Sequence, residues 1–148
     1  MSAHSLLLIE DNPDDIELIL GILAKLVPRN EIEICTDGVA ALDYLFCRAA
    51  HVARNPLEQP RLVLLDLNLP RLSGFEVLRE IRAGANTRLV PVVILSASAE
   101  QKDVRAASQF GANSYAKKPI QFSQLNSTLE LLAHYWLDLN IPPPCRLD

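Results

Sequence analysis

Short apolar segments alternate with amphipathic segments along the chain, and this alternation restricts the fold more than any other feature. Three of the apolar segments are nearly continuous, which is typical of strands that are buried on both faces of a parallel sheet. The segment 31–35 instead alternates apolar and polar residues, which indicates a strand with one wetter face. The expected strands are 5–9, 31–35, 61–65, 91–96 and 113–117.

Helical patterns with one apolar face separate the expected strands. Asn12 is a typical N-cap, Pro13 suits the first helical position, and Asp14 and Asp15 suit the first turn. Gly111 is placed to end the fourth helix at the C′ position. The last helix has an apolar stripe that we expect to face the core: Phe122, Leu125, Leu129, Leu132 and Trp136. The expected helices are 13–27, 37–50, a third that carries Phe75, Leu78 and Ile81, then 99–110 and 122–139.

Five strand–helix units in series predict an α/β protein with a parallel sheet covered by helices on both faces. This is the doubly wound (βα)5 class, a flavodoxin-like three-layer sandwich. A strand order of 2-1-3-4-5 places the alternating strand 31–35 at an edge, where its wetter face fits. The length of 148 residues predicts one domain, with a core over about 5–138 and a C-terminal extension over about 139–148.

Composition excludes several functions. The net charge of −4 argues against a nucleic-acid partner, which would require a basic face. No apolar run approaches the roughly 20 residues of a membrane span, and the first residues have no basic segment typical of a signal peptide. The three cysteines have no metal-binding spacing, so we expect reduced thiols in a cytoplasmic protein. Cys145 lies in the Pro-rich tail, where oxidation would cross-link two chains.

Polar residues follow the expected strands where the carboxyl ends of the sheet meet. Glu10 and Asp11 follow the first strand, and Asp66 interrupts a leucine run at the end of the third. Ser96 ends the fourth strand, and Lys118 follows the fifth. Ligands of open α/β sheets bind beyond these carboxyl ends, so the five side chains should share one crevice.

The chemistry of this set indicates phosphoryl transfer. Clustered carboxylates repel one another and need a cation nearby, and their hard oxygens suit Mg²⁺. Asp66 beside Mg²⁺ and Lys118 would be a suitable phosphoryl acceptor. Ser96 could donate a hydrogen bond to a phosphoryl oxygen.

Four motifs in order resemble the receiver domain of two-component response regulators. They are EDN at 10–12, LLDLNLPRLSG at 64–74, LSAS at 95–98 and KP at 118–119. The resemblance implies that Asp66 accepts a phosphoryl group from a phosphohistidine of a sensor histidine kinase. It also implies that Asp11 ligates Mg²⁺ directly, that Glu10 assists through water, and that the backbone carbonyl of Asn68 is a further ligand.

The resemblance implies a switch as well. Ser96 would be the switch hydroxyl and Lys118 the phosphoryl-binding cation. Tyr115 would be the switch aromatic, turning inward as Ser96 moves toward the phosphate. The Lys118–Pro119 bond is expected to be cis. The domain would not be an enzyme in the usual sense, because it catalyses only its own phosphotransfer and a slow autodephosphorylation, tuned by Asn68 and Ser98.

Two departures from a minimal receiver suggest a subfamily. The connector at 51–60 is long, and the tail at 134–144 continues past the usual last helix, after which we expect no effector domain. Both are similar to the stand-alone regulators that partner bacterial phytochrome kinases. Such relatives can dimerise through helix four, strand five and helix five. Leu131 and Tyr135 form a second stripe on the last helix that suits this contact.

Other interpretations remain for single residues and for the whole chain. Taken alone, Glu10 and Asp11 could cap a helix, Asp66 could be a turn residue, and Tyr115 could be an ordinary half-buried aromatic. An aspartate-nucleophile phosphohydrolase would need a carboxylate two residues after Asp66, where Asn68 stands. A phosphorylation-independent interaction module on the same fold remains the main alternative.

Overall fold

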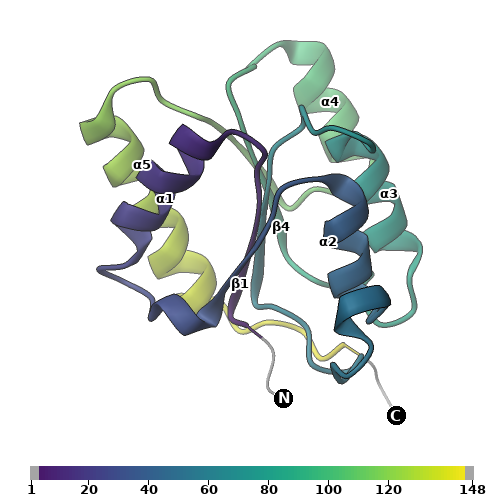
Figure 1. Cartoon of the computed structure of the whole chain (residues 1–148). Helices are drawn as coiled ribbons and strands as arrows, with labels where there is room; N and C mark the ends of the chain where they lie inside the picture. The colour runs from purple at the N-terminus through teal and green to yellow at the C-terminus, as the bar shows by residue number, and fades with distance from the viewer. Residues whose placement is uncertain (1–3, 146–148) are drawn as a thin grey trace.

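A five-stranded parallel sheet forms the centre of the molecule in the computed structural model, which describes residues 4–145 (Figure 1). The strands lie in the order β2-β1-β3-β4-β5, as the sequence predicted. The alternating strand β2 is at one edge, and β1 pairs with both β2 and β3. The strands are β1 Leu6–Ile9, β2 Ile32–Cys35, β3 Leu62–Leu65, β4 Val92–Ser96 and β5 Ser114–Lys117.

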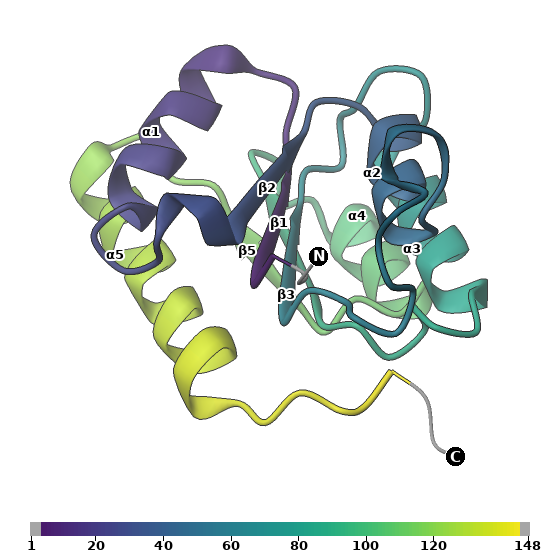
Figure 2. The same cartoon turned by 60° about the horizontal axis from the view of Figure 1, so that its bottom comes forward.

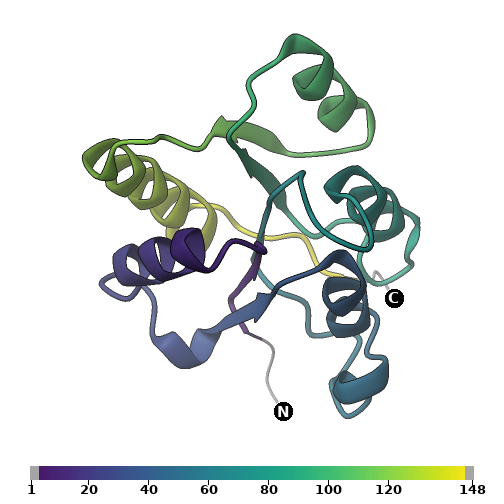
Figure 3. The same ribbon diagram turned by 45° about the horizontal axis from the view of Figure 1, so that its top comes forward.

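Helices cover both faces of the sheet. Figures 1 and 3 show α1 and α5 together on one face and α2, α3 and α4 on the other. The α-helices are α1 Pro13–Leu23, α2 Gly38–Leu45, α3 Gly74–Ala83, α4 Gln101–Gln109 and α5 Phe122–Ala133. None of the helices in residues 4–145 has the length and apolarity needed to cross a membrane.

Each central strand contributes side chains to two separate cores. Leu7 and Ile9 of β1 pack on the α2–α4 side, while Leu6 and Leu8 pack on the α1–α5 side. Strand side chains point to opposite faces in turn, so a strand covered by helices on both sides must be apolar throughout. This is why the runs at β1, β3 and β4 are continuous. In these three strands, polar groups therefore fit only at the strand ends.

The second helix is shorter than the sequence suggested. It ends at Leu45, and Cys47 adopts a left-handed backbone conformation with φ 57°. The backbone N–H of Arg48 then donates to the carbonyl of Asp43 at 2.8 Å, a Schellman-type helix end. The buried Arg54 holds this end in place, because its guanidinium donates to the Tyr44 carbonyl and lies over the Tyr44 ring.

The last helix also departs from the expected pattern. Regular α-helix ends at Ala133 and continues as a π-helix over His134–Leu139. Leu125 and Leu129 are buried as expected, but Phe122 is 55% exposed and does not join the core. It is the first residue of α5 and lines a cavity together with Leu18 of α1 and Ile120. After the π-helix the tail runs from the α5 side toward the α2–α3 side (Figure 2), and Arg61 donates to the Asn140 carbonyl at 3.0 Å.

Candidate functional site

Three carboxylates meet at the carboxyl ends of β1 and β3. Ile9 pairs with Leu65 in the parallel register, so Glu10 and Asp66 follow at adjacent positions of neighbouring strands. Together with Asp11, their side-chain oxygens lie within 4.8 Å of one another. Glu10 and Asp66 are buried, while Asp11 is exposed. The sequence predicted this cluster, and the structure brings its three members together.

Lys118 supplies the positive charge that the cluster requires. Its Nζ lies 2.5 Å from Glu10 Oε1 and 3.8 Å from Asp66 Oδ2. The backbone N–H of Lys118 donates to the Ser96 carbonyl at 2.6 Å, which continues the β4–β5 pairing by one residue and aims the side chain across the crevice. A further carboxylate, Asp15 in the first turn of α1, lies 3.0 Å from the same Nζ. The sequence marked Asp15 only as a helix-start residue.

Burial and charge shift the proton affinities of Glu10 and Lys118. Burial of Glu10, helped by the negative charge of Asp66, raises its pKa from 4.5 to about 7, although the Lys118 hydrogen bond opposes the shift. Burial by itself would lower the pKa of Lys118. The hydrogen bonds to Glu10 and Asp15 and the charge of Asp66 outweigh that effect and raise it. Lys118 is therefore a permanent cation in this crevice.

The oxygen donors of the crevice fit a small, hard divalent cation. The two oxygens of Glu10 are already engaged: Oε2 accepts from the backbone N–H groups of Asp11 and Asn12, and Oε1 accepts from Lys118. Asp11 is the carboxylate of the cluster that is most accessible to an incoming ion. Asn68 is exposed beside the cluster, and its N–H donates to Asp66 Oδ1 at 3.3 Å. An oxygen-only set with carboxylate charge suits Mg²⁺ or Mn²⁺ better than a soft metal.

Ser96 connects the crevice to α4 through a short hydrogen-bond network. Its side chain is fully buried, and its Oγ accepts from the backbone N–H of Ser98 at 3.3 Å. The Ser98 carbonyl accepts from the Tyr115 hydroxyl at 2.8 Å, and the Ser98 hydroxyl donates to Asp103 of α4 at 2.7 Å. Tyr115 is half-buried and packs against the core on the α2–α4 side. The sequence had singled out Ser98 only for its position near an attacking water, not as this connection.

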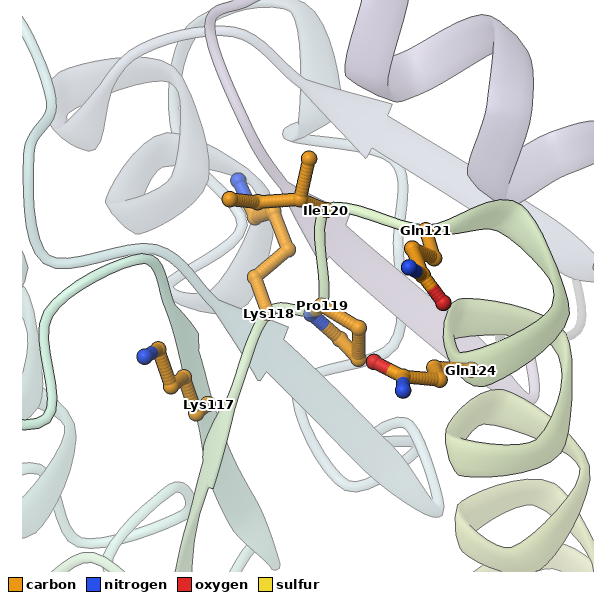
Figure 4. A pocket seen from close by; sticks show the side chains of 6 residues that line it. All are labelled: Lys117, Lys118, Pro119, Ile120, Gln121 and Gln124. Carbon is orange, nitrogen blue, oxygen red and sulfur yellow. The ribbon is translucent and has the colours of Figure 1, made fainter.

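The segment after β5 corrects one expectation. Residues 4–145 contain no cis peptide bond, so the prediction of a cis Lys118–Pro119 bond is wrong for this structure. Lys118 pairs with Ser96 through its backbone N–H, and the peptide bond that follows, to Pro119, is trans. Ile120, the next residue, is fully exposed. Figure 4 shows the side chains of Lys117 and Lys118 diverging from this segment, beside a cavity of about 420 Å³ that Gln121 and Gln124 also line.

The fold and the crevice define a class: flavodoxin-like α/β proteins with an acidic site and a lysine at the carboxyl edge of the sheet. The chain belongs to the response regulator receiver domain family, whose sequence profile matches residues 6–130. Receiver domains are phospho-acceptors of two-component systems and bind divalent metal. A histidine kinase is the partner that this family implies.

Similar proteins include regulators associated with phytochromes. The chain is 41% identical to the probable methanogenesis regulatory protein FilR2 of Methanothrix harundinacea, over 93% of this chain and 86% of that one. It is 33% identical to the response regulator Rcp1 of Synechocystis, over 90% of this chain and 88% of that one. The structure resembles that of the phosphorylated cyanobacterial phytochrome response regulator RcpA, with a TM-score of 0.87, 34% identity, and coverage of 96% of this chain and 99% of that one.

Proposed function

We propose that Asp66 accepts a phosphoryl group from a phosphohistidine of a sensor histidine kinase. The observation that carries the proposal is the Lys118 ammonium 3.8 Å from Asp66 Oδ2, inside a cluster of three carboxylates. An Asp66 oxygen forms a bond to phosphorus while the phosphorus–nitrogen bond breaks. The electron pair of the broken bond stays on the imidazole nitrogen. Lys118 is placed to neutralise the charge of the transferred group, and phosphoryl transfer depends mainly on such positioning and neutralisation.

Mg²⁺ is the cofactor that we propose for this transfer. Asp11, Asp66 and the backbone carbonyl of Asn68 would hold it directly, and Glu10 would act through water, since both of its oxygens already accept hydrogen bonds. When bound, the ion would neutralise the charge of the phosphoryl group and orient the phosphoryl oxygens. A relative of this chain, Rcp1, has a structure described as its Mn²⁺-bound form, at 32% identity and a TM-score of 0.83.

The output of the switch would run through Ser96. When the Ser96 hydroxyl turns toward a phosphoryl group, the N–H of Ser98 loses its acceptor. Ser98 also holds the Tyr115 hydroxyl and Asp103 of α4, so the change reaches the face formed by α4, β5 and α5. Slow autodephosphorylation, tuned by Asn68 and Ser98, would reset the switch.

We propose that this face forms a homodimer. Leu131 is 72% exposed and Tyr135 is 48% exposed, on the second stripe of the last helix. Burying two large apolar side chains from each copy would favour association. Leu131→Glu together with Tyr135→Glu should give a monomer in analytical ultracentrifugation with beryllofluoride, where the wild type is a dimer. A monomeric wild type under the same conditions would contradict the proposal.

The kinase is proposed to be a bacterial phytochrome, which is supported by the similarity to RcpA and Rcp1. The protein would then act in the cytoplasm, where the kinase is phosphorylated from ATP, and without contact to nucleic acid. The alternative of a phosphorylation-independent module is not favoured, because the family match and the complete set of Asp66, Lys118 and acidic partners agree with a phospho-acceptor.

Phosphorylation can be tested directly. The protein is incubated with acetyl phosphate and Mg²⁺, and intact mass is measured for the wild type, Asp66→Asn and Asp37→Asn. Asp37 follows β2 at the same sheet edge but lies outside the cluster, and asparagine preserves its role as the N-cap of α2. We expect a gain of one phosphoryl group in the wild type and in Asp37→Asn, and none in Asp66→Asn. An equal gain in Asp66→Asn would refute Asp66 as the acceptor.

A further inference from the structure

Asp15 makes a contact in the crevice that the proposed phosphotransfer does not require. Its Oδ2 lies 3.0 Å from Lys118 Nζ, yet it does not belong to the three carboxylates that could share a metal ion. Asp15 is one of two acidic residues in the first turn of α1. The other, Asp14, is exposed, and its side chain has no hydrogen bond or ion pair in residues 4–145. Two adjacent aspartates thus differ in whether they reach Lys118.

The cap of α1 holds Asp15 at the crevice. The side-chain oxygen of Asn12 accepts from the backbone N–H groups of Asp14 at 2.9 Å and Asp15 at 3.2 Å. This fixes the first turn directly after Glu10 and Asp11, so that one side of the turn faces β5. The Asp15 side chain is 33% exposed, while Lys118 is 11% exposed. The pair therefore lies at the border between the crevice and solvent.

The Lys118 ammonium lies toward α1 and not over Asp66. An ammonium has three N–H donors. One is within hydrogen-bond distance of Glu10 and a second is within hydrogen-bond distance of Asp15, whereas Asp66 is 3.8 Å away. To donate to a phosphoryl group on Asp66, the ammonium would have to move toward Asp66, and its contacts with Glu10 and Asp15 oppose that movement. Glu10 is buried and also held by two backbone N–H groups, so Asp15 is the partner that Lys118 can leave at lower cost.

We propose that Asp15 is a positioning residue that holds Lys118 in the unphosphorylated arrangement and competes with the phosphoryl group for its ammonium. The inference rests on the proposed role of Asp66 and Lys118. Loss of the Asp15 charge should free Lys118 for a phosphoryl group and tighten the binding of phosphoryl analogues. In the wild type, Asp15 sets how readily the domain leaves its resting state.

The test measures the affinity for beryllofluoride, a phosphoryl analogue, at saturating Mg²⁺ by isothermal titration calorimetry. Asp15→Asn should bind it about three- to tenfold more tightly than the wild type, as expected for the loss of one partly buried charge-assisted contact. Asp14→Asn removes the same charge from the same turn and should change the affinity by less than about twofold. Asp15→Glu keeps the carboxylate and should remain near the wild type. The affinity for Mg²⁺ alone should be equal in Asp15→Asn and Asp14→Asn, because neither residue is proposed as a ligand.

Several results would overturn the inference. It fails if Asp15→Asn gains no more than Asp14→Asn, if it binds beryllofluoride more weakly, or if Asp15→Glu shows the same gain as Asp15→Asn. Asp15→Ser provides a second variant should Asp15→Asn fold poorly in a thermal melt. Failure of the underlying function looks different: the wild type would then bind no beryllofluoride, or Asp66→Asn would bind it equally well.

Discussion

Gly74 offers a test of how closely the acceptor segment is packed. A Cβ at this position would lie 2.5 Å from the Asp66 carbonyl oxygen and 2.6 Å from Leu67 Cα, while ordinary contacts begin at 3.4 Å. Gly74→Ala must therefore separate the start of α3 from the acceptor by about 0.8–0.9 Å to restore ordinary contacts. Such overpacking costs about 1–3 kcal/mol of unfolding free energy, which lowers the urea midpoint by roughly 1 M at a typical m-value.

The same displacement should slow phosphorylation. Asp66 would move relative to Lys118, and an ångström of misplacement can cost about a hundredfold in rate, so we expect labelling by acetyl phosphate to slow about tenfold. Gly21→Ala is the matched control, because a Cβ there meets nothing within 4 Å. In an exposed helix position the added methyl group should raise stability by about 0.5–1 kcal/mol and leave the labelling rate unchanged.

Urea unfolding followed by circular dichroism and timed intact-mass measurements give both quantities for each variant. The packing argument would be refuted if Gly74→Ala matched Gly21→Ala in stability and in labelling rate. A loss of stability with normal labelling would show that α3 moves and the acceptor does not.

Three further predictions concern the anchors and charges of the chain. Arg54→Met should lower the unfolding free energy by about 2–4 kcal/mol, because the carbonyls of Tyr44 and Glu58 lose their donor and the Tyr44 ring loses its cation. Arg48→Met is the comparison in the same urea titration: the Arg48 side chain is 57% exposed, so its loss should cost less than about 1 kcal/mol. The pKa of Glu10 is raised to about 7 in the folded state, so its contribution to stability is complete below pH about 4.5 and is lost as the pH rises through 7. The unfolding free energy of the metal-free wild type should fall by up to about 3 kcal/mol over this pH range. A Glu10→Gln variant whose unfolding free energy fell equally with pH would contradict this. Asp11→Asn should weaken Mg²⁺ binding about tenfold or more in a calorimetric titration, and unchanged affinity would remove Asp11 from the ligand set.

The interior of a buried strand excludes charged side chains, whereas the position after its carboxyl end admits them, and this difference explains why the site was predictable. Within a strand such as β3, every residue from Leu62 to Leu65 faces a packed helix layer, so a carboxylate is excluded there. Asp66 comes one residue later, where the helix layers end and water or a cation can reach it. The sequence shows this boundary as a single charge at the end of an apolar run.

The sequence by itself determined the parallel sheet, its strand order and the cluster of Glu10, Asp11 and Asp66 with Lys118 beside it, because alternation of apolar segments and the polar residues that follow them are local properties. Only the tertiary structure decided the contact of Asp15 with Lys118. This contact joins residues 103 positions apart, and it depends on how the capped first turn of α1 lies against the end of β5. The tertiary structure also decided the early end of α2, which a hydrogen bond from Arg54 to the Tyr44 carbonyl holds in place. Both features depend on a hydrogen bond between separate segments of the chain, which local sequence patterns do not show.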